Sequence, residues 1–225
     1  MRRRLLIATL LCAATDAGAQ AGPLADLAER LDAQALTEAS SVRITSRAAL
    51  PDGDRRLRTR SVFSISSDRA ARWEVTAGDA TRTVWVTATD AASVVGDSAT
   101  AMGESARQQV LDAMWLDPVV LLMRSWEVDA QALTDDLIQV EVPGRRHPVL
   151  IGLNASGLPV RITSLRDRGA KRQYVAVRFS DFRRVDGMLL PFRAVQTVDG
   201  KTTGEVTIER IDLDERLAGV PFDRE

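Results

Sequence analysis

The chain has 225 residues and a formal net charge of −1 at pH 7, with 30 basic and 31 acidic side chains. A balance this even offers no broad basic surface for nucleic acid or anionic lipid. One cysteine and one histidine exclude a disulfide framework and a zinc site built from several of these residues.

The N-terminal segment has the pattern of a secretory signal peptide. Arginines at positions 2–4 precede a short apolar run at 5–14, and Ala17-Gly18-Ala19 provides the small residues of a cleavage site before Gln20. The apolar run is too short to span a bilayer. An alternative is acylation at Cys12, but Leu11 is larger than the residue that a lipoprotein signal needs there. We therefore expect a signal peptide over 1–19, a soluble periplasmic protein, and a single domain over 20–225.

The first part of that domain is expected to be a helix followed by strands. Leucines recur at helical spacing over 23–39 among charged side chains, which predicts an amphipathic helix. Alternating apolar and polar residues predict strands over 41–49, 57–66, 71–77 and 81–88, and a shorter one over 93–95. Turn residues at 51–54 and 78–79 separate these strands.

The pattern then changes to a helical one. Apolar side chains fall on one stripe over 104–115, and Asp117-Pro118 predicts a second short helix, because Asp is favoured at the N-cap and Pro at the first helical position. Further strands are predicted over 137–142, 148–153 and 158–165.

Two hairpins near the C-terminus carry the strongest structural signal. Strand residues 174–182 lead through Asp186-Gly187 to 189–192, and Asp199-Gly200 leads to 205–209. Asp-Gly provides the positive φ that tight hairpin turns require, and the alternation gives one buried and one wetted face. The sequence therefore predicts a twisted antiparallel sheet of roughly ten strands with two or three helices.

The same hairpins contain a longer motif, Phe179-x-Asp181-Phe182-x-x-Val185-Asp186-Gly187-x-x-Leu190-Pro191-Phe192. Leu153-Asn154-x-x-Gly157-Leu158-Pro159 precedes it, and Leu213-x-x-x-Leu217 and Phe222 follow it. Together these residues resemble the C-terminal half of the LolA/LolB-like periplasmic proteins. The resemblance implies an α+β fold that is mainly antiparallel β, an unclosed half-barrel whose concave face is covered by helices around an apolar cavity.

Residues that could perform chemistry do not form a recognisable active site. His147 lies beside two arginines, and no serine occupies a G-x-S-x-G elbow. Asp135-Asp136 and the run Asp212-x-Asp214-Glu215 lack the spacing of paired catalytic carboxylates or of a calcium loop. We expect no catalytic residue, no metal, no cofactor and no enzymatic activity.

The function that we expect is the binding of an apolar ligand, such as an acyl chain, a lipid or a lipoprotein. Methionine and tryptophan adapt to irregular ligands, although ordinary core packing is the alternative for each residue. The apolar cavity candidates are Phe63, Trp73, Met114, Trp115, Leu122, Met123 and Trp126. In the lipoprotein carriers an arginine on an early strand helps to hold the partner, so the resemblance implies Arg43 or Arg47 as a polar cavity residue. An alternative function is a module that uses the same fold to bind or sense an envelope protein.

Overall fold

The computed structural model describes residues 22–52, 55–66, 70–169 and 171–214. The predicted signal peptide, and Leu217 and Phe222 of the C-terminal motif, lie outside these residues. No helix of the described part of the chain is long and apolar enough to cross a membrane.

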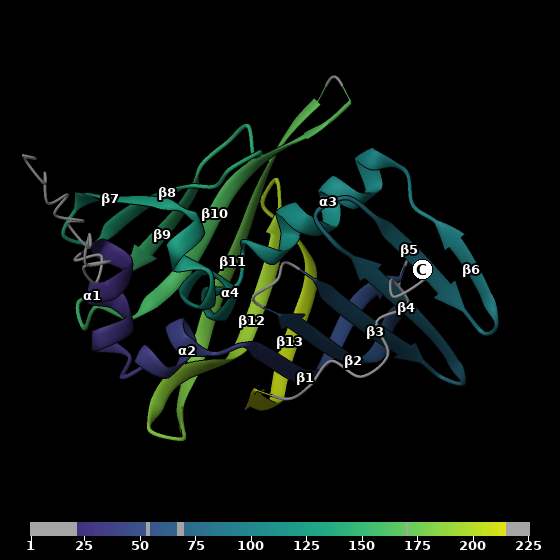
Figure 1. Cartoon of the computed structure of the whole chain (residues 1–225), viewed down its shortest axis with the longest axis horizontal. Helices are drawn as coiled ribbons and strands as arrows, with labels where there is room; N and C mark the ends of the chain where they lie inside the picture. Colours follow the sequence, from purple (N-terminus) through teal and green to yellow (C-terminus); the bar gives the residue numbers. More distant parts are fainter. Residues whose placement is uncertain (1–21, 53–54, 67–69, 170, 215–225) are drawn as a thin grey trace, which may run out of the picture.

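The described residues form one antiparallel sheet of thirteen strands, which consists of two meanders (Figure 1). The first meander contains β1 (Ser41–Asp52), β2 (Arg55–Ser66), β3 (Ala71–Ala77), β4 (Ala80–Val86), β5 (Ala91–Val95) and β6 (Ser98–Ala101). The second contains β7 (Asp129–Thr134), β8 (Leu137–Glu141), β9 (Val149–Leu153), β10 (Pro159–Arg168), β11 (Lys171–Val185), β12 (Met188–Val198) and β13 (Lys201–Leu213).

The sheet is not closed into a full barrel. Strand β13 returns to pair with β1, which joins the two meanders in the middle of the sheet, while β6 and β7 stand at the two edges. An unclosed antiparallel half-barrel with few helices is therefore confirmed. The sequence predicted fewer strands than the thirteen found among the described residues, mainly because it did not indicate the two edge strands.

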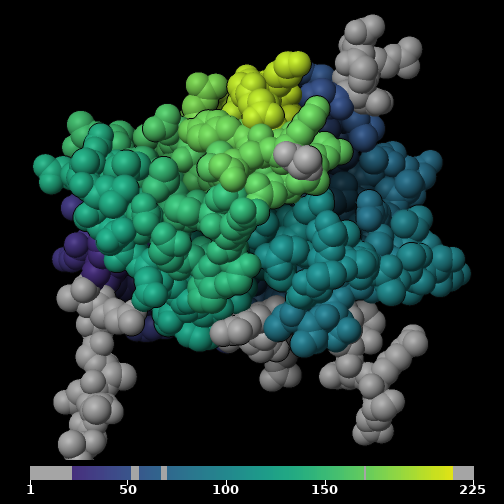
Figure 2. Space-filling model, turned by 90° about the horizontal axis from the view of Figure 1, so that it is seen from above, coloured from purple at the N-terminus to yellow at the C-terminus, as the bar shows by residue number. Residues whose placement is uncertain are grey.

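Helices connect and cover the two meanders. Near the N-terminus lie α1 (Pro23–Arg30) and α2 (Gln34–Glu38), and the crossing from β6 to β7 contains α3 (Glu104–Met114), α4 (Pro118–Met123) and the 3₁₀ turn η1 (Ser125–Glu127). Figure 1 shows α3 and α4 in front of the sheet, between its two halves. Seen from above, the surfaces of these two halves, blue and green, lie side by side (Figure 2).

One helix was predicted over 23–39, and the structure has two. The chain turns at Asp32, which has a φ of 51°, and the carbonyl of Leu31 accepts a hydrogen bond of 2.7 Å from the backbone N–H of Leu189 at the start of β12. In a continuous helix, the carbonyl of Leu31 would accept a hydrogen bond from an N–H of the helix itself. Here its partner is a residue far away in the sequence.

The main hydrophobic core lies where α1, α2 and α4 meet the sheet. All six residues of α4 are buried. They pack with the buried leucines of α1 and α2 and with inward-facing residues of both meanders, among them Val42, Ile65, Ile151 and Ile162. A smaller cluster at Val84, Val86 and Ala91 packs against Met102 and against Val110 and Leu111 in the second half of α3. Helix α3 is less buried than α4, because Met114 is the residue of α3 that is buried.

Both predicted Asp-Gly turns have the expected backbone. Asp186 and Gly187 have φ values of 48° and 89°, and Asp199 and Gly200 have φ values of 50° and 80°. Positive φ at both central residues is the mark of the type I′ turn, whose twist matches that of the flanking strands. These turns therefore set the register of β11, β12 and β13.

Candidate functional site

An apolar cavity of about 230 Å³ lies between the inner face of the sheet and the crossing helices. Residues of β1, β2, β3, β11, β12 and β13 form one side, and residues of α3 and the start of α4 form the other. We call this space the cavity. Its lining is largely apolar, with Phe63, Phe179 and Ile208 from the sheet and Val110, Met114 and Leu116 from the crossing segment.

Strand register explains why these side chains face the same space. Ile44 pairs with Phe63, and Phe63 pairs with Trp73, so the three side chains lie in one row across β1, β2 and β3. Directly paired residues of an antiparallel sheet lie on the same face. Phe179 of β11 pairs with Ala194 of β12 and continues the inner surface in the second meander.

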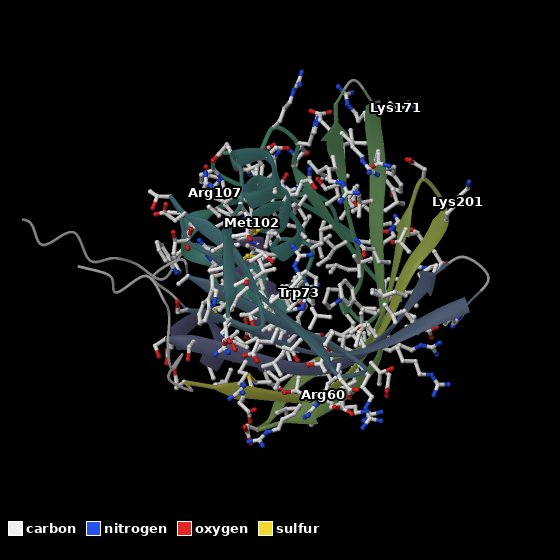
Figure 3. The ribbon with its side chains drawn as sticks, turned by 90° about the vertical axis from the view of Figure 1, so that its right-hand side faces the viewer. Arg60, Trp73, Met102, Arg107, Lys171 and Lys201 are labelled. Atoms are coloured by element: carbon white, nitrogen blue, oxygen red, sulfur yellow. The ribbon has the colours of Figure 1, made fainter. Side chains whose placement is uncertain are left out.

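Three of the seven apolar residues predicted for the site line the cavity: Phe63, Trp73 and Met114. Trp73 lies at the rim, since 40% of its surface is exposed although it contacts the cavity. Figure 3 shows it toward the middle of the structure, inside the curve of the sheet, with Arg60 on the outer side.

The other four predicted residues do not line the cavity. Leu122 and Met123 are each 1% exposed in the main core, and Trp115 is also buried, with the Arg124 guanidinium 4.8 Å from the centre of its ring. Trp126 lies in the η1 turn and is 56% exposed. Of the five candidates in the crossing segment, Met114 therefore lines the cavity, Trp115, Leu122 and Met123 lie in the core, and Trp126 lies on the surface.

Arg43 and Arg47 lie on the opposite face of β1 from the cavity. Val42, Ile44 and Ser46 are buried and face inward, whereas both arginines are exposed. Arg47 forms an ion pair of 2.6 Å with Glu209 on the outer face. Because side chains alternate along a strand, a residue next to an inward one must point outward, and the structure places neither arginine in the cavity.

The outer face of the second meander is hollowed and basic. A depression of about 650 Å³ spans β8 to β12 there, and Arg161, Arg178 and Arg193 line it. Arg161 pairs with Arg178 across β10 and β11, so the two guanidinium groups share this face. The depression is larger than the cavity, but its arginines face the outer side of the sheet rather than the space under the helices.

A few polar groups interrupt the apolar lining of the cavity. The Oγ atoms of Ser46 and Ser61 are 2.9 Å apart on β1 and β2, and Gln196 on β12 also faces the cavity. The fourth group is Asp117, at the junction of α3 and α4. Asp117 is the only charged residue among the described residues that line this space.

The sequence predicted Asp117 as a helix cap, and the structure confirms that role while placing the residue at the cavity. Its Oδ1 accepts a hydrogen bond of 2.8 Å from the backbone N–H of Val119. Burial raises the pKa of the Asp117 carboxyl to about 6, although the backbone N–H groups of Val119 and Val120 act in the opposite direction. The residue keeps part of its surface accessible on the cavity side.

Helix α3 is attached on both sides of the space that it covers. Near its C-terminus, Arg145 Nη1 donates to the carbonyl of Asp112 over 2.7 Å, and Nη2 donates to Ser164 Oγ over 2.9 Å. The Arg145 side chain is 5% exposed, and this burial lowers its pKa while Asp112 acts to raise it. Near the N-terminus of α3, Arg107 donates to the carbonyl groups of Thr87 and Ala88 after β4.

Potential catalytic and metal-binding groups lie elsewhere. His147 Nε2 is 3.2 Å from Asp167 Oδ2, in a groove of about 250 Å³ that borders α3 and is lined mainly by polar residues. Among the residues that the structure describes, no group of three or more histidine, cysteine or acidic side chains could hold a metal ion.

Three solved structures share this architecture. A LolA superfamily protein from Nitrosomonas europaea is 13% identical, the match covers 86% of this chain and 94% of that one, and the TM-score is 0.56. A putative outer membrane lipoprotein-sorting protein domain from Vibrio parahaemolyticus is 10% identical, with 89% and 95% covered and a TM-score of 0.56. A DUF1329 family protein from Desulfovibrio piger is 13% identical, with 88% and 95% covered and a TM-score of 0.57.

Neither protein-family models nor curated protein sequences match the chain. The similarity is therefore one of structure. At this level of identity it defines the fold alone, because one fold supports many functions. The protein has a LolA-like fold. The resemblance of its C-terminal hairpins to that fold is confirmed.

Proposed function

We propose that this protein is a carrier-like binding protein that holds the apolar part of a lipid, lipoprotein or similar ligand in the cavity. The observation that carries the proposal is the apolar space of about 230 Å³ between the inner face of the sheet and α3–α4. The description of the Vibrio parahaemolyticus domain as a putative lipoprotein-sorting protein supports the same class of ligand. The predicted signal peptide over 1–19 supports action in the periplasm.

Burial of the ligand provides the binding energy. Each buried methylene contributes about 0.8 kcal/mol, so a chain that buries about eight of them gains about 6 kcal/mol. That gain corresponds to a dissociation constant of tens of micromolar before the cost of immobilising the chain. Binding of this kind needs no catalytic group, and we propose that no reaction accompanies it.

A pair of substitutions on β12 tests whether the cavity is the binding site. Ala194 faces the cavity, whereas its neighbour Val195 lines the depression on the outer face. Ala194→Phe should fill part of the cavity, and Val195→Phe adds a ring on the other side of the same strand. The probe is 1-decanol, and binding is followed by the intrinsic fluorescence of tryptophan, because Trp73 lies at the rim.

We expect saturable binding of 1-decanol to the wild type, with one ligand per chain. Ala194→Phe should weaken it by about tenfold or more, and Val195→Phe should leave it unchanged. Equal affinities of the two folded variants would remove the cavity as the binding site. If the wild type binds no decanol at all, the carrier proposal fails and a module that binds a protein partner becomes the better hypothesis.

A further inference from the structure

The cavity contains one carboxylate and no cation among its described lining residues. Asp117 lies where α3 ends and α4 begins, and Oδ1 is held by the backbone N–H of Val119. This contact fixes the carboxylate beside the space that an apolar chain would occupy. The opposite arrangement, with a cation at the ligand's carboxylate, would favour the anion of a free fatty acid.

Within the described part of the chain, no charged side chain compensates Asp117 from the elements packed around it. The lining residues of α3 and α4 are apolar, those of β1 and β2 are apolar apart from the hydroxyl pair Ser46–Ser61, and β12 contributes the uncharged Gln196. A smaller hollow shares Gln196 and Leu116 with the cavity, and its lining includes three charged residues, Asp112, Arg145 and Arg166.

Those three groups are already engaged with other partners. Arg145 binds the carbonyl of Asp112 and Ser164 Oγ, and its Nε lies 3.7 Å from Asp112 Oδ1. Arg166 donates to Gln173 Oε1 over 3.1 Å. Among the described lining residues of the cavity, an ionised Asp117 is therefore the one that carries a charge.

A carboxylate in such a place discriminates between ligands by their polar ends. It repels a second anion, because both charges would be removed from water in a space of low dielectric constant. It attracts a cation and accepts a hydrogen bond from a hydroxyl or an amine. Ser46, Ser61 and Gln196 add uncharged hydrogen-bonding groups for the same end of the ligand.

We propose that Asp117 selects amphiphiles whose polar end is a hydrogen-bond donor, either a neutral hydroxyl or a cationic amine, and excludes the anions of free fatty acids. The inference rests on the proposed function, since it names the class of ligand that the cavity takes. It assigns to Asp117 a binding role in addition to its role as the N-cap of α4.

The test compares three ligands of equal chain length, 1-decanol, decylamine and decanoate, by tryptophan fluorescence at pH 7.5. The wild type should bind decanoate at least about tenfold more weakly than decanol, and decylamine at least as tightly as decanol. Asp117→Asn should bring decanoate to within about threefold of decanol and weaken decylamine by about fivefold or more. Asp79→Asn is the control, because it removes the same charge from an exposed turn outside the cavity and should change none of the three affinities.

A second measurement follows decanoate binding in the wild type as the pH is lowered from 7.5 to 5. Most of the Asp117 carboxyl becomes neutral over this range, so the affinity of the wild type for decanoate should rise. In Asp117→Asn, any change in affinity comes from the titration of decanoate itself, and the rise should therefore be smaller than in the wild type. If Asp117→Asn does not fold, the ranking of the three ligands in the wild type and this pH dependence test the inference without it.

The outcomes separate the two proposals. Binding of all three ligands with equal affinity, unchanged in a folded Asp117→Asn variant, overturns the role of Asp117 and leaves the carrier proposal intact. Binding of none of them by the wild type overturns the carrier proposal itself. The expected ranking, together with its loss in Asp117→Asn but not in Asp79→Asn, supports both.

Discussion

Asp117→Asn should also make the protein more stable at neutral pH, and this gain should disappear in acid. Burial raises the pKa of the Asp117 carboxyl from 3.8 to about 6 in the folded protein. The folded protein therefore binds this proton more tightly than the unfolded chain does. As a result, the contribution of Asp117 to stability falls as the pH rises from about 4 to about 6, and it stays low above that range.

The pKa difference sets the size of the effect. About two pKa units correspond to about 3 kcal/mol, which is the largest gain that removal of the charge could give above pH 7. Asp117 keeps part of its surface accessible at the cavity, so a gain of about 1–2 kcal/mol is the expected value. Asparagine retains a side-chain oxygen for the N–H of Val119, and the cap of α4 should therefore survive.

The assay is urea denaturation of both proteins between pH 4 and pH 8, followed by tryptophan fluorescence. Other carboxyls, such as that of Glu205, whose pKa is lowered by the neighbouring Arg193 and Arg56, affect both proteins alike. The difference between the two free energies of unfolding thus isolates Asp117. A variant that is no more stable than the wild type at pH 7.5, or a difference that is the same at pH 4 and pH 7.5, would refute the reasoning.

Three further substitutions test the turn, the core and the attachment of α3. Gly187→Val should lower the free energy of unfolding by more than about 1 kcal/mol, because Gly187 has a φ of 89°, and an unchanged denaturation midpoint would contradict this. Leu122→Arg should prevent folding, since the charge would replace a side chain that is 1% exposed, and a folded variant with native circular dichroism would show that this site tolerates it. Arg145→Met should cost about 1–3 kcal/mol and speed amide hydrogen exchange in α3 more than in β12, and equal exchange in the two elements would rule out a specific attachment.

Local patterns in the sequence were enough to predict most of the sheet and its class. The Asp-Gly turns need only two residues to specify their backbone, and the flanking alternation specifies which face is buried. Asp117-Pro118 likewise predicted the start of α4, where cap and first helical residue lie side by side in the chain. These features depend on neighbours in sequence, so they can be recognised without the fold.

The two strands that were not predicted stand at the edges of the sheet. All four residues of β6 are exposed, and so is nearly all of β7. An edge strand that buries neither face has no reason to alternate apolar and polar residues, and only its pairing with β5 or β8 makes it a strand. The break between α1 and α2 has a similar origin, because it accompanies a contact between Leu31 and Leu189.

The division between core and cavity depended on tertiary structure alone. Met114, Trp115 and Leu122 have the same apolar character, and their spacing predicts burial for all of them. Whether buried space is filled depends on how closely the helices approach the sheet: α4 and the N-terminal helices fill one part of the half-barrel, and α3 leaves the other part open. Periodicity tells which side chains turn inward, whereas the cavity and the carboxylate of Asp117 within it arise only where residues of distant strands and helices meet.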